Sequence, residues 1–460
     1  MVQPPDKRAA GADNERALTY EELFEPFRKS FKPAAKWAIG VESERFGVRE
    51  INGEPLRYAG AGGVTEVLDI LENRFGWSPE SEVPGGPVIL LNRGRSQITL
   101  EPGGQVELSG APHPDIHHVH EETRLHLSEL GRLSECMGIQ WMSIGFHPLA
   151  HQEELDWVPK LRYGVMREYL ATRGKHAHDM MRRTGTVQVN FDYSDEQDAL
   201  RKLRVSLRLS PVVAAMFANS PFVEGHVFGG RSLRQLVWHH VDPDRQGLLP
   251  KMWDPRTTIR DYIEWALDVP MFLVKRPGQI VRNTGQTFRS YLSDGFQGTR
   301  ATMSDWTTHL NTLFPEVRLK NTLEMRGADA QPFEVMCALP ALWTGIVYDD
   351  LALEQAERLT ADWSFERMER VRGDAIMQGL STPFLGKTLA HAAEQVMTVA
   401  RDGLVRRARR SESTGEDETK YLDEIAPLLA HGQTPADRLV AGLEDRIGSL
   451  RDEILRRVGP

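Results

Sequence analysis

The chain has 460 residues, of which 40% are hydrophobic and 26% charged, with a formal net charge of -9 and a mean hydropathy of -0.42. The negative charge argues against a general affinity for nucleic acid, and no run of about 18 apolar residues predicts a membrane span. The first residues, MVQPPDKRAAGADNER, lack an apolar signal core, and Cys136 and Cys337 are the only cysteines. We therefore expect a cytoplasmic protein with reduced thiols.

The hydrophobic periodicity predicts strands dispersed among helices. In chain order, we expect a leader and an N-terminal helix over 1–30, a strand over 36–48, a helix over 65–75, strands over 88–92 and 96–110, and a helix over 115–137 capped by Asp115. We then expect strands over 138–148 and 184–193, helices over 195–218 and 257–267, a strand over 317–327, a mostly helical region from 332 and a mobile surface loop over 406–420.

This dispersal of strands favours an α+β fold with a largely antiparallel sheet. No convincing interdomain linker or internal repeat is present. We expect the leader and helix of 1–30 to precede a core over 31–350, and a mainly helical part over 351–460 to pack on the same domain.

Four of the expected strands carry polar or charged residues two positions apart. Such residues point to one face of a strand, so each strand is predicted to be polar on one side and mainly apolar on the other. An isolated pair is typical of a half-exposed strand, whereas four pairs suggest a sheet whose polar face binds something. The pairs are Glu42 and Glu44, Gln105 and Glu107, Gln188 and Asn190, and Glu324 and Arg326.

The carboxylates of these pairs indicate a divalent-metal site. Carboxylates gathered on one surface repel each other unless a cation neutralises them. Glu42 and Glu44 are the strongest candidates, because apolar neighbours such as Ile39 and Phe46 predict a strand inside the fold. Mg²⁺ prefers oxygen ligands and often bridges to nucleotide phosphates. The alternative interpretation of this pair is a solvated strand face.

The other polar residues leave alternatives open. Glu101 and Glu107 bracket a Pro-Gly-Gly turn, so either side chain could face the site. Glu324 beside Arg326 could be a buried structural ion pair, or a metal ligand beside an arginine that grips a phosphate. Gln188 could complete a metal shell through its oxygen, although such amides are more often structural.

Several longer segments resemble the plant-type glutamate–cysteine ligases, a type shared by plants and many proteobacteria. The resemblance is dense over residues 36–350 and looser beyond them. The segments that carry it include GVESERFGV, ITLEPGGQVELSGAP, PKLRYGVM, TVQVNFDYS, DWTTHLNTLFPEVRLK, and LEMRGAD followed by CALPALW.

This resemblance implies the fold of the glutamine synthetase superfamily, in which a curved, mostly antiparallel sheet forms a bowl surrounded by helices. It also implies ATP-dependent joining of the γ-carboxylate of L-glutamate to the amine of L-cysteine through γ-glutamyl phosphate, the first step of glutathione biosynthesis. Mg²⁺ is the implied cofactor, and the implied assembly is a monomer or a homodimer.

The resemblance assigns roles to particular residues. The implied Mg²⁺ ligands are Glu42, Glu44, Glu107 and Glu324, with Glu101 as a further candidate and Gln188 at the position of a histidine ligand in distant relatives. Arg326 resembles the arginine that holds the transferring phosphate, with Glu324 beside it. Arg162, Thr186 and Arg234 resemble glutamate-binding residues, and Arg245 is a weaker candidate.

Two other functions remain open from the sequence. One is a related carboxylate–amine ligase with another amine acceptor, or one that feeds another thiol pathway. The other is a non-catalytic protein that binds a metal or an amino acid on a ligase scaffold. The intact residues Glu42, Glu44, Glu324 and Arg326 argue against the second.

Overall fold

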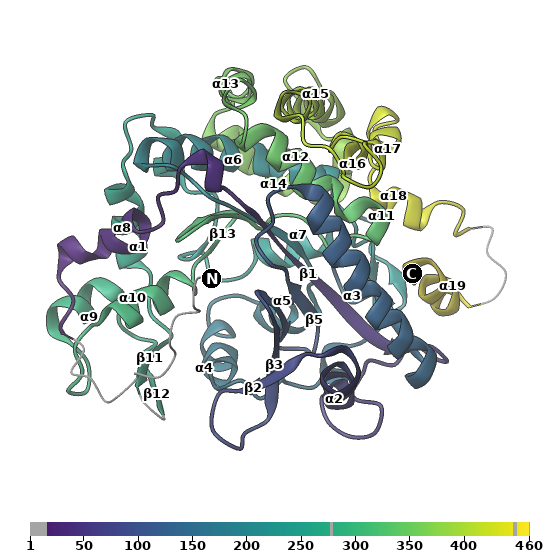
Figure 1. Ribbon diagram of the computed structural model, residues 1–460, viewed down its shortest axis with the longest axis horizontal. Coiled ribbons are helices and arrows are strands. Elements are labelled where there is room, and N and C mark those ends of the chain that lie inside the picture. The colour runs from purple at the N-terminus through teal and green to yellow at the C-terminus, as the bar shows by residue number, and fades with distance from the viewer. Residues whose placement is uncertain (1–15, 277–278, 445–448, 460) are drawn as a thin grey trace.

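The computed structural model describes residues 16–276, 279–444 and 449–459. A nine-stranded antiparallel sheet runs through the middle of the molecule (Figure 1). The strand order is β14 (Val317–Leu319), β15 (Leu323–Met325), β7 (Val187–Phe191), β1 (Ile39–Arg49), β5 (Val106–Ser109), β4 (Ser96–Leu100), β3 (Val88–Arg93) and β2 (Ser78–Ser81), with β6 (Ile139–Met142) paired to the end of β1. The predicted α+β class with an antiparallel sheet is confirmed.

Strand β1 is the centre of this sheet. Its first half lies between β7 and β5, and its second half pairs with β6. Successive side chains of a strand point to opposite faces, so Val41 enters the core while Glu42 and Glu44 face the other side. The strand therefore separates a packed layer from a polar surface.

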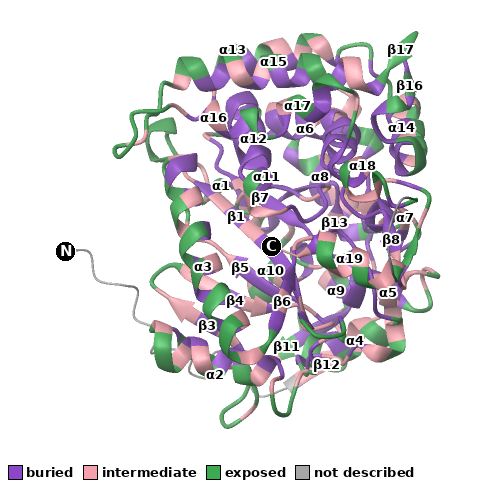
Figure 2. Cartoon of the chain, turned by 90° about the vertical axis from the view of Figure 1, so that its right-hand side faces the viewer, coloured by how far each residue is buried: buried purple, intermediate pink, exposed green. Residues whose placement is uncertain are grey.

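Four helices contact the strands across the sheet: α6 (Glu196–Met216) against β14 and β15, α12 (Ala338–Val347) against β7 and β1, α3 (Ile116–Met137) against β1 and β6, and α2 (Val64–Phe75) against β3. All ten residues of α12 are buried, because α13 (Asp350–Leu359) and α15 (Leu389–Arg407) pack outside it (Figure 2). Val189, Phe191 and Leu323 of the strands share one hydrophobic cluster with these helices.

Helix α3 begins and ends where its sequence requires. The Asp115 side chain accepts a hydrogen bond from the His118 backbone N–H at 3.0 Å, which satisfies a donor in the first turn. The helix ends at Gly138, whose φ of 61° is in the left-handed region that glycine adopts at little cost. The helix predicted over 115–137 is confirmed.

The remaining helices and strands complete the described chain. They are η1 (Tyr20–Phe24), α1 (Glu25–Arg28), η2 (Ala34–Lys36), η3 (Gln152–Glu154), α4 (Leu161–Leu170), α5 (Ala177–Arg183), β8 (Phe222–Val223), β9 (His226–Val227), α7 (Leu233–His239), β10 (Gln246–Gly247), η4 (Pro250–Trp253), α8 (Ile259–Asp268), β11 (Leu273–Arg276), β12 (Gln279–Arg282), α9 (Phe288–Asp294), α10 (Met303–Leu310) and β13 (Phe314–Pro315). After them come α11 (Phe333–Met336), α14 (Phe365–Gln378), η5 (Gly379–Ser381), β16 (Pro383–Phe384), β17 (Lys387–Thr388), α16 (Lys420–Asp423), α17 (Ala426–Ala430), α18 (Pro435–Val440) and α19 (Leu450–Val458).

The structure corrects three predicted elements. The single strand over 317–327 is a hairpin, because the Lys320 N–H donates to the Thr322 carbonyl at 2.9 Å and reverses the chain between β14 and β15. The strand over 138–148 is interrupted: its beginning pairs as β6, and farther on Phe146 forms an isolated bridge with Thr184. The surface loop expected over 406–420 is anchored, since the buried Glu418 carboxylate accepts the Ile116 N–H at 2.8 Å. The leader before residue 16 lies outside the described residues.

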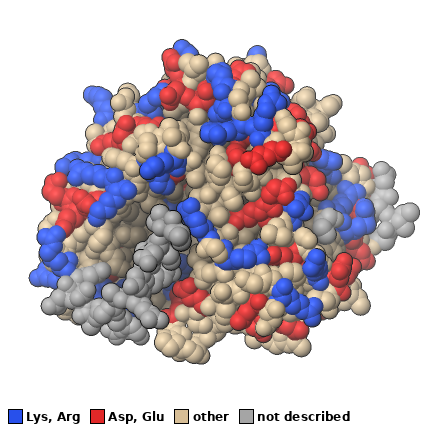
Figure 3. All heavy atoms as spheres, in the orientation of Figure 1, with Lys and Arg blue, Asp and Glu red and all other residues tan. Residues whose placement is uncertain are grey.

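The described helices include none that is by itself long and apolar enough to cross a membrane. One bent pair, Phe333–Val347 with Asp350–Leu359, passes the same test of length and composition. On the face shown in Figure 3, Lys and Arg side chains are interspersed with Asp and Glu, so the described surface there carries no extended patch of one sign.

Replacing Phe191 with alanine is expected to lower the free energy of unfolding by about 3–5 kcal/mol, because the ring is fully buried and packs edge-on against Tyr348 at 5.0 Å. Ile51→Ala is the control, since Ile51 is 91% exposed, and its effect is expected to stay within about 0.5 kcal/mol. Urea denaturation followed by circular dichroism measures both. Equal effects would contradict the burial of the apolar sheet face.

Candidate active site

A cavity of about 410 Å³ lies on the polar face of the central sheet. Carboxylates, cationic side chains and apolar side chains all contribute to its wall. The lining residues include Glu42, Glu44, Thr99, Glu101, Gln105, Glu107, Lys160, Arg162, Thr186, Gln188, Arg234, Lys275, Arg318 and Arg326, together with Met166, Met180, Trp238, Phe272 and Phe314.

The register of the sheet brings the predicted residues together. Glu44 lies opposite Glu107 on β5, and Glu42 lies opposite Gln188 on β7. Residues directly opposite each other in an antiparallel pair point to the same face. Thr99 of β4 continues the row beside Glu107. The polar pairs are thus one surface, as the spacing of these residues predicts.

The three central carboxylates are held in an unfavourable environment. Burial, with the charges of Glu324 and Glu107, raises the pKa of Glu42 to about 7. Burial, then the charges of Glu101 and Glu107, raises the pKa of Glu44 well above its ordinary value. Burial and Glu101 also raise the pKa of Glu107. Because each shift comes from desolvation and like-charge repulsion, a cation bound among these carboxylates would relieve both.

Glu324 has the opposite environment. Its carboxylate accepts hydrogen bonds from Arg318 at 2.5 and 3.0 Å, from Lys320 at 3.4 Å and from Arg326 at 3.2 Å. Burial opposes ionisation, but these three cations hold the pKa of Glu324 well below its ordinary value. Glu324 is not among the residues that line the cavity, so it reaches the site through the cations that surround it.

Arg326 connects the two environments. Its Nη1 donates to the Gln188 Oε1 at 2.6 Å and to Glu324, and the guanidinium lines the cavity. Gln188 in turn lies beside Glu42 in the register. An anion in the cavity can therefore meet a fixed guanidinium close to the acidic row.

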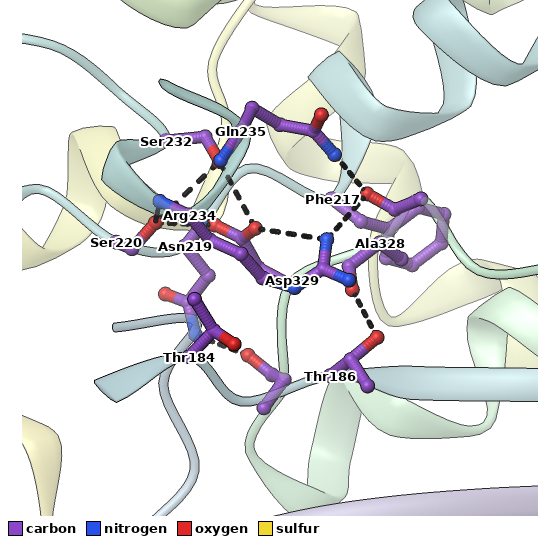
Figure 4. A network of polar contacts seen from close by, with 12 residues as sticks. Thr184, Thr186, Phe217, Asn219, Ser220, Ser232, Arg234, Gln235, Ala328 and Asp329 are labelled. Carbon is purple, nitrogen blue, oxygen red and sulfur yellow. Dashed lines mark hydrogen bonds and ion pairs between the residues drawn. The ribbon is translucent and has the colours of Figure 1, made fainter. Parts of the chain in front are cut away.

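A buried network fixes the segment that follows β15 (Figure 4). Arg234 donates to the carbonyl oxygens of Arg326 and Gly327 at 2.9 and 3.0 Å, and lies 4.0 Å from the Asp329 carboxylate. Thr186 donates to the Ala328 carbonyl at 2.7 Å. The Arg234 Nε is buried and has no hydrogen-bond partner among the described residues.

Asp329 is the centre of the same network. Its carboxylate accepts hydrogen bonds from the Ser220 and Ser232 hydroxyls at 2.7 and 3.0 Å and from the Asn219 backbone N–H at 2.8 Å. These bonds compensate a carboxylate that is 1% exposed. The network orients Arg234 and holds the backbone that carries Arg326.

The expectation that Arg245 binds substrate is corrected by the structure. Its guanidinium is completely buried, pairs with Asp242 at 2.8 Å, and donates to the carbonyl oxygens of Thr312 and Pro270. It does not line the cavity. The spacing in DPDRQG places this arginine three residues after its own carboxylate partner, which makes it a structural cation.

Some lining residues were not expected from the sequence. Lys160 is buried in the cavity wall with its ammonium 5.4 Å from the centroid of the Tyr163 ring, and burial lowers its pKa. Arg318 lines the cavity while it pairs with Glu324. The segments PKLRYGVM and FPEVRLK contain these cations, but neither segment shows by spacing alone that they point into the site.

The donor set of the cavity suits a hard divalent cation. Carboxylate oxygens are the ligands that Mg²⁺ prefers, and the raised pKa values indicate an unmet need for positive charge. As the side chains stand, the described part of the chain contains no group of three His, Cys, Asp or Glu residues gathered closely enough to hold a metal ion. Mg²⁺ therefore stays a prediction.

Comparison with known proteins identifies the family. Residues 38–457 match the family described as glutamate-cysteine ligase family 2. The chain is 40% identical over 461 residues to the chloroplastic glutamate–cysteine ligase of Medicago truncatula, covering 99% of this chain and 88% of that one. It is also 40% identical to the chloroplastic enzyme of Arabidopsis thaliana, over 99% and 85% of the two chains.

Solved structures support the fold at lower identity. The glutamate–cysteine ligase of Francisella tularensis, solved in complex with AMP, matches with a TM-score of 0.55 and 13% identity over 93% of this chain and 88% of that one. A bifunctional glutathione synthetase of Pasteurella multocida matches with a TM-score of 0.51 and 14% identity, over 95% of this chain and 53% of that one.

The predicted cytoplasmic location is wrong by the same comparison, because the similar curated enzymes are chloroplastic. The prediction depended on the lack of an apolar signal core. That feature argues only against a secretory signal, since plastid transit peptides are themselves polar and rich in serine and arginine.

Arg245→Met is expected to lower the free energy of unfolding by about 3 kcal/mol, because it leaves the buried Asp242 carboxylate with Arg173 as its remaining cation. Arg162→Met is the matched comparison, since Arg162 is exposed at the cavity and forms no ion pair within the described chain. Its unfolding free energy is expected to change by less than about 0.5 kcal/mol. Thermal and urea denaturation measure both variants, and a stable Arg245→Met protein would contradict the structural role.

Proposed function

The chain belongs to the glutamate-cysteine ligase family 2, and on that premise we propose that it joins the γ-carboxylate of L-glutamate to the amine of L-cysteine at the expense of ATP. The observation that carries the proposal is the single cavity in which the row of Glu42, Glu44 and Glu107 faces the guanidinium of Arg326. The glutamate row can bind the cation that accompanies a nucleotide. The guanidinium can bind the phosphoryl group that is transferred.

The chemistry requires an activated carboxylate. A carboxylate oxygen is a poor leaving group, so glutamate first attacks the γ-phosphorus of ATP to give γ-glutamyl phosphate and ADP. The cysteine amine then attacks the acyl carbon, and inorganic phosphate leaves as γ-glutamylcysteine forms. The enzyme contributes orientation and charge compensation, because no covalent bond to the protein is needed.

We assign the protein's cations to the anionic parts of this reaction. Arg326 holds the transferring phosphoryl group, and the hydrogen bonds to Gln188 and Glu324 fix its orientation. Arg162 and Arg234, which both line the cavity, bind the carboxylates of glutamate. Thr186 fixes the backbone beside the glutamate pocket.

The proposed Mg²⁺ ligands are Glu42, Glu44 and Glu107, with Glu101 beside them and Gln188 able to add its oxygen. When bound, Mg²⁺ would neutralise the nucleotide phosphates. Glu324 stays a predicted ligand that would first have to exchange its hydrogen bonds with Arg318, Lys320 and Arg326. The carboxylates of the row and the Arg326 guanidinium line the same cavity, and Gln188 contacts Arg326 from its place opposite Glu42.

Other features of this proposal stay predictions from the sequence and its family resemblance. They are a bowl-shaped sheet of the glutamine synthetase type, the division of the chain at residues 30 and 350, and a monomeric or homodimeric assembly. The competing function is a related ligase that uses another amine, or whose product feeds another thiol pathway.

Arg326→Gln is expected to lower kcat by about 10²–10³-fold, because it removes a preorganised charge opposite the transferring phosphoryl group. ADP release, coupled to a dehydrogenase and measured in the presence of glutamate and cysteine, reports the rate. Arg256→Gln is the matched control, since Arg256 is 88% exposed and pairs only with Asp254 within the described chain. Undiminished turnover in a folded Arg326→Gln protein would refute the assignment.

The same assay separates the competing functions. ADP release is expected to depend on both glutamate and cysteine when each is omitted in turn. Comparable turnover with another amine in place of cysteine would favour a related ligase. No turnover with any amine, despite binding of glutamate, would favour a non-catalytic protein.

Glu107→Gln is expected to raise the Mg²⁺ concentration for half-maximal activity by at least about tenfold, because an ionised oxygen ligand is lost while the shape is kept. Removal of metal with EDTA is expected to abolish wild-type activity, and added Mg²⁺ is expected to restore it. Glu135→Gln is the control, since Glu135 is exposed on α3. An unchanged Mg²⁺ dependence in Glu107→Gln would exclude this residue as a ligand.

A further inference from the structure

The far face of β1 carries a positive charge that the proposed ligation does not use. Because successive residues of a strand point to opposite faces, Ser43 and Arg45 face away from the cavity that Glu42 and Glu44 line. Arg45 is 1% exposed, which makes it one of the largest fully buried side chains of the described structure. The same strand thus presents acids on one side and a cation on the other.

The Arg45 guanidinium has few partners. It has five N–H donors, but its side-chain hydrogen bonds are one to the Ser43 hydroxyl at 3.1 Å and a weak one to the Met336 sulfur at 3.8 Å. Its Nε has no partner, and no carboxylate of the described residues pairs with it. The other fully buried arginine, Arg245, has its carboxylate in Asp242.

An uncompensated buried charge is unfavourable. Moving a cation out of water costs several kcal/mol unless an anion compensates it. The Arg45 guanidinium stays charged at neutral pH, because arginine is not deprotonated in proteins. Burial lowers the pKa of the neighbouring His126 to about 3, and the charges of Arg45 and Arg93 lower it further. This part of the interior therefore favours an anion.

Arg45 lines a second cavity of about 290 Å³, separate from the active-site cavity. Most of its wall is apolar and comes from α3, β6, the beginning of α11 and the C-terminal helix α19. The apolar lining residues are Leu127, Leu130, Trp141, Ile144, Phe333 and Val458. Its volume lies near the lower end of the range for pockets that bind small molecules, about 300–1,000 Å³.

The other polar groups of this wall are already engaged. Arg457 pairs with Glu453 and donates to the carbonyl oxygens of Leu439 and Ala441. The Asn219 amide donates to the Ser143 and Ala330 carbonyls. Glu334, the carboxylate on the wall, is exposed and does not pair with Arg45. Arg45 is thus the fully buried cation of this wall, and no carboxylate of the described residues pairs with it.

We propose that this second cavity binds a small amphipathic monocarboxylate, with its carboxylate on Arg45 and its apolar body between α3 and α19. A guanidinium fork matches the two oxygens of a carboxylate. A dianion such as phosphate would leave one negative charge uncompensated among apolar side chains, so a single charge on an apolar body fits better. The inference does not depend on the proposed ligation, because it concerns the opposite face of β1.

Isothermal titration calorimetry with phenylacetate and hexanoate tests the proposal on the full chain, with glutamate present throughout to occupy the active-site cavity. Saturable binding at one site is expected for these carboxylates. Phenylacetamide, which has nearly the same shape and no charge, is expected to bind at least tenfold more weakly. Arg45→Met is expected to weaken phenylacetate binding by at least tenfold.

The controls separate a binding role of Arg45 from a structural one. Arg457→Met changes another arginine of the same wall and is expected to keep phenylacetate binding within about twofold. Arg45→Met is expected to unfold at the same or a higher temperature than the wild type, because it replaces an uncompensated buried charge with an apolar side chain. If Arg45→Met does not fold, Arg45→Lys keeps the charge and is expected still to prefer phenylacetate over phenylacetamide.

Three outcomes would overturn the proposal. They are the absence of saturable carboxylate binding to the wild-type protein, equal binding to the wild type and a folded Arg45→Met variant, and equal affinity of a folded protein for phenylacetate and phenylacetamide. Each outcome is measured as ligand binding and not as ligase activity. A failure of the proposed ligase function would therefore leave this test unchanged.

Discussion

The structure depends on one constraint: several glutamates lie close together on the cavity face of the central sheet, where they are buried and repel each other. Glu42, Glu44 and Glu107 are brought together by the register of β1 and β5, and no neighbouring strand can separate them without losing its backbone pairing. Burial and mutual repulsion raise the pKa of each. A fold that keeps such a cluster must either supply positive charge from the chain or take it from a ligand.

The protein uses both solutions within one cavity. Glu324 takes its compensation from Arg318, Lys320 and Arg326, and it stays ionised inside the fold. The carboxylates of β1 and β5 have no comparable set of cations and depend on something that enters. The two halves of the site thus differ in where their counter-charge comes from, although the residue type is the same. One cavity thus contains carboxylates that lack a counter-charge and a guanidinium that already has one.

The sequence predicts the strand spacing well, and the physical reason is simple. The side-chain period of a strand is two residues, so the common face of Glu42 with Glu44 and of Gln188 with Asn190 can be predicted without knowing the partners. The caps at Asp115 and Gly138 are equally local signals. These features need no information about distant parts of the chain.

The features that could not be predicted depend on tertiary contacts. Arg245 and Arg318 are both arginines near motif-like segments, but one is enclosed by Asp242 and two carbonyl oxygens while the other reaches the cavity. The turn at Lys320 that divides β14 from β15 depends on one backbone hydrogen bond. The cellular location was also beyond the sequence argument, since it depended on a missing signal rather than on a present one.

The cations around Glu324 affect how an anion binds in the cavity and how it is released. Because Arg326 and Arg318 already bind a carboxylate of the protein, an incoming phosphate replaces one partner by another and does not meet free charges. Such an exchange makes the binding free energy of the phosphate less favourable, because ion pairs with Glu324 are broken when the phosphate binds. It lowers the free-energy cost of phosphate release by the same amount, because the arginines then pair with Glu324 again. Under the proposed function, the built-in carboxylate would favour release of the phosphate product over its tight retention.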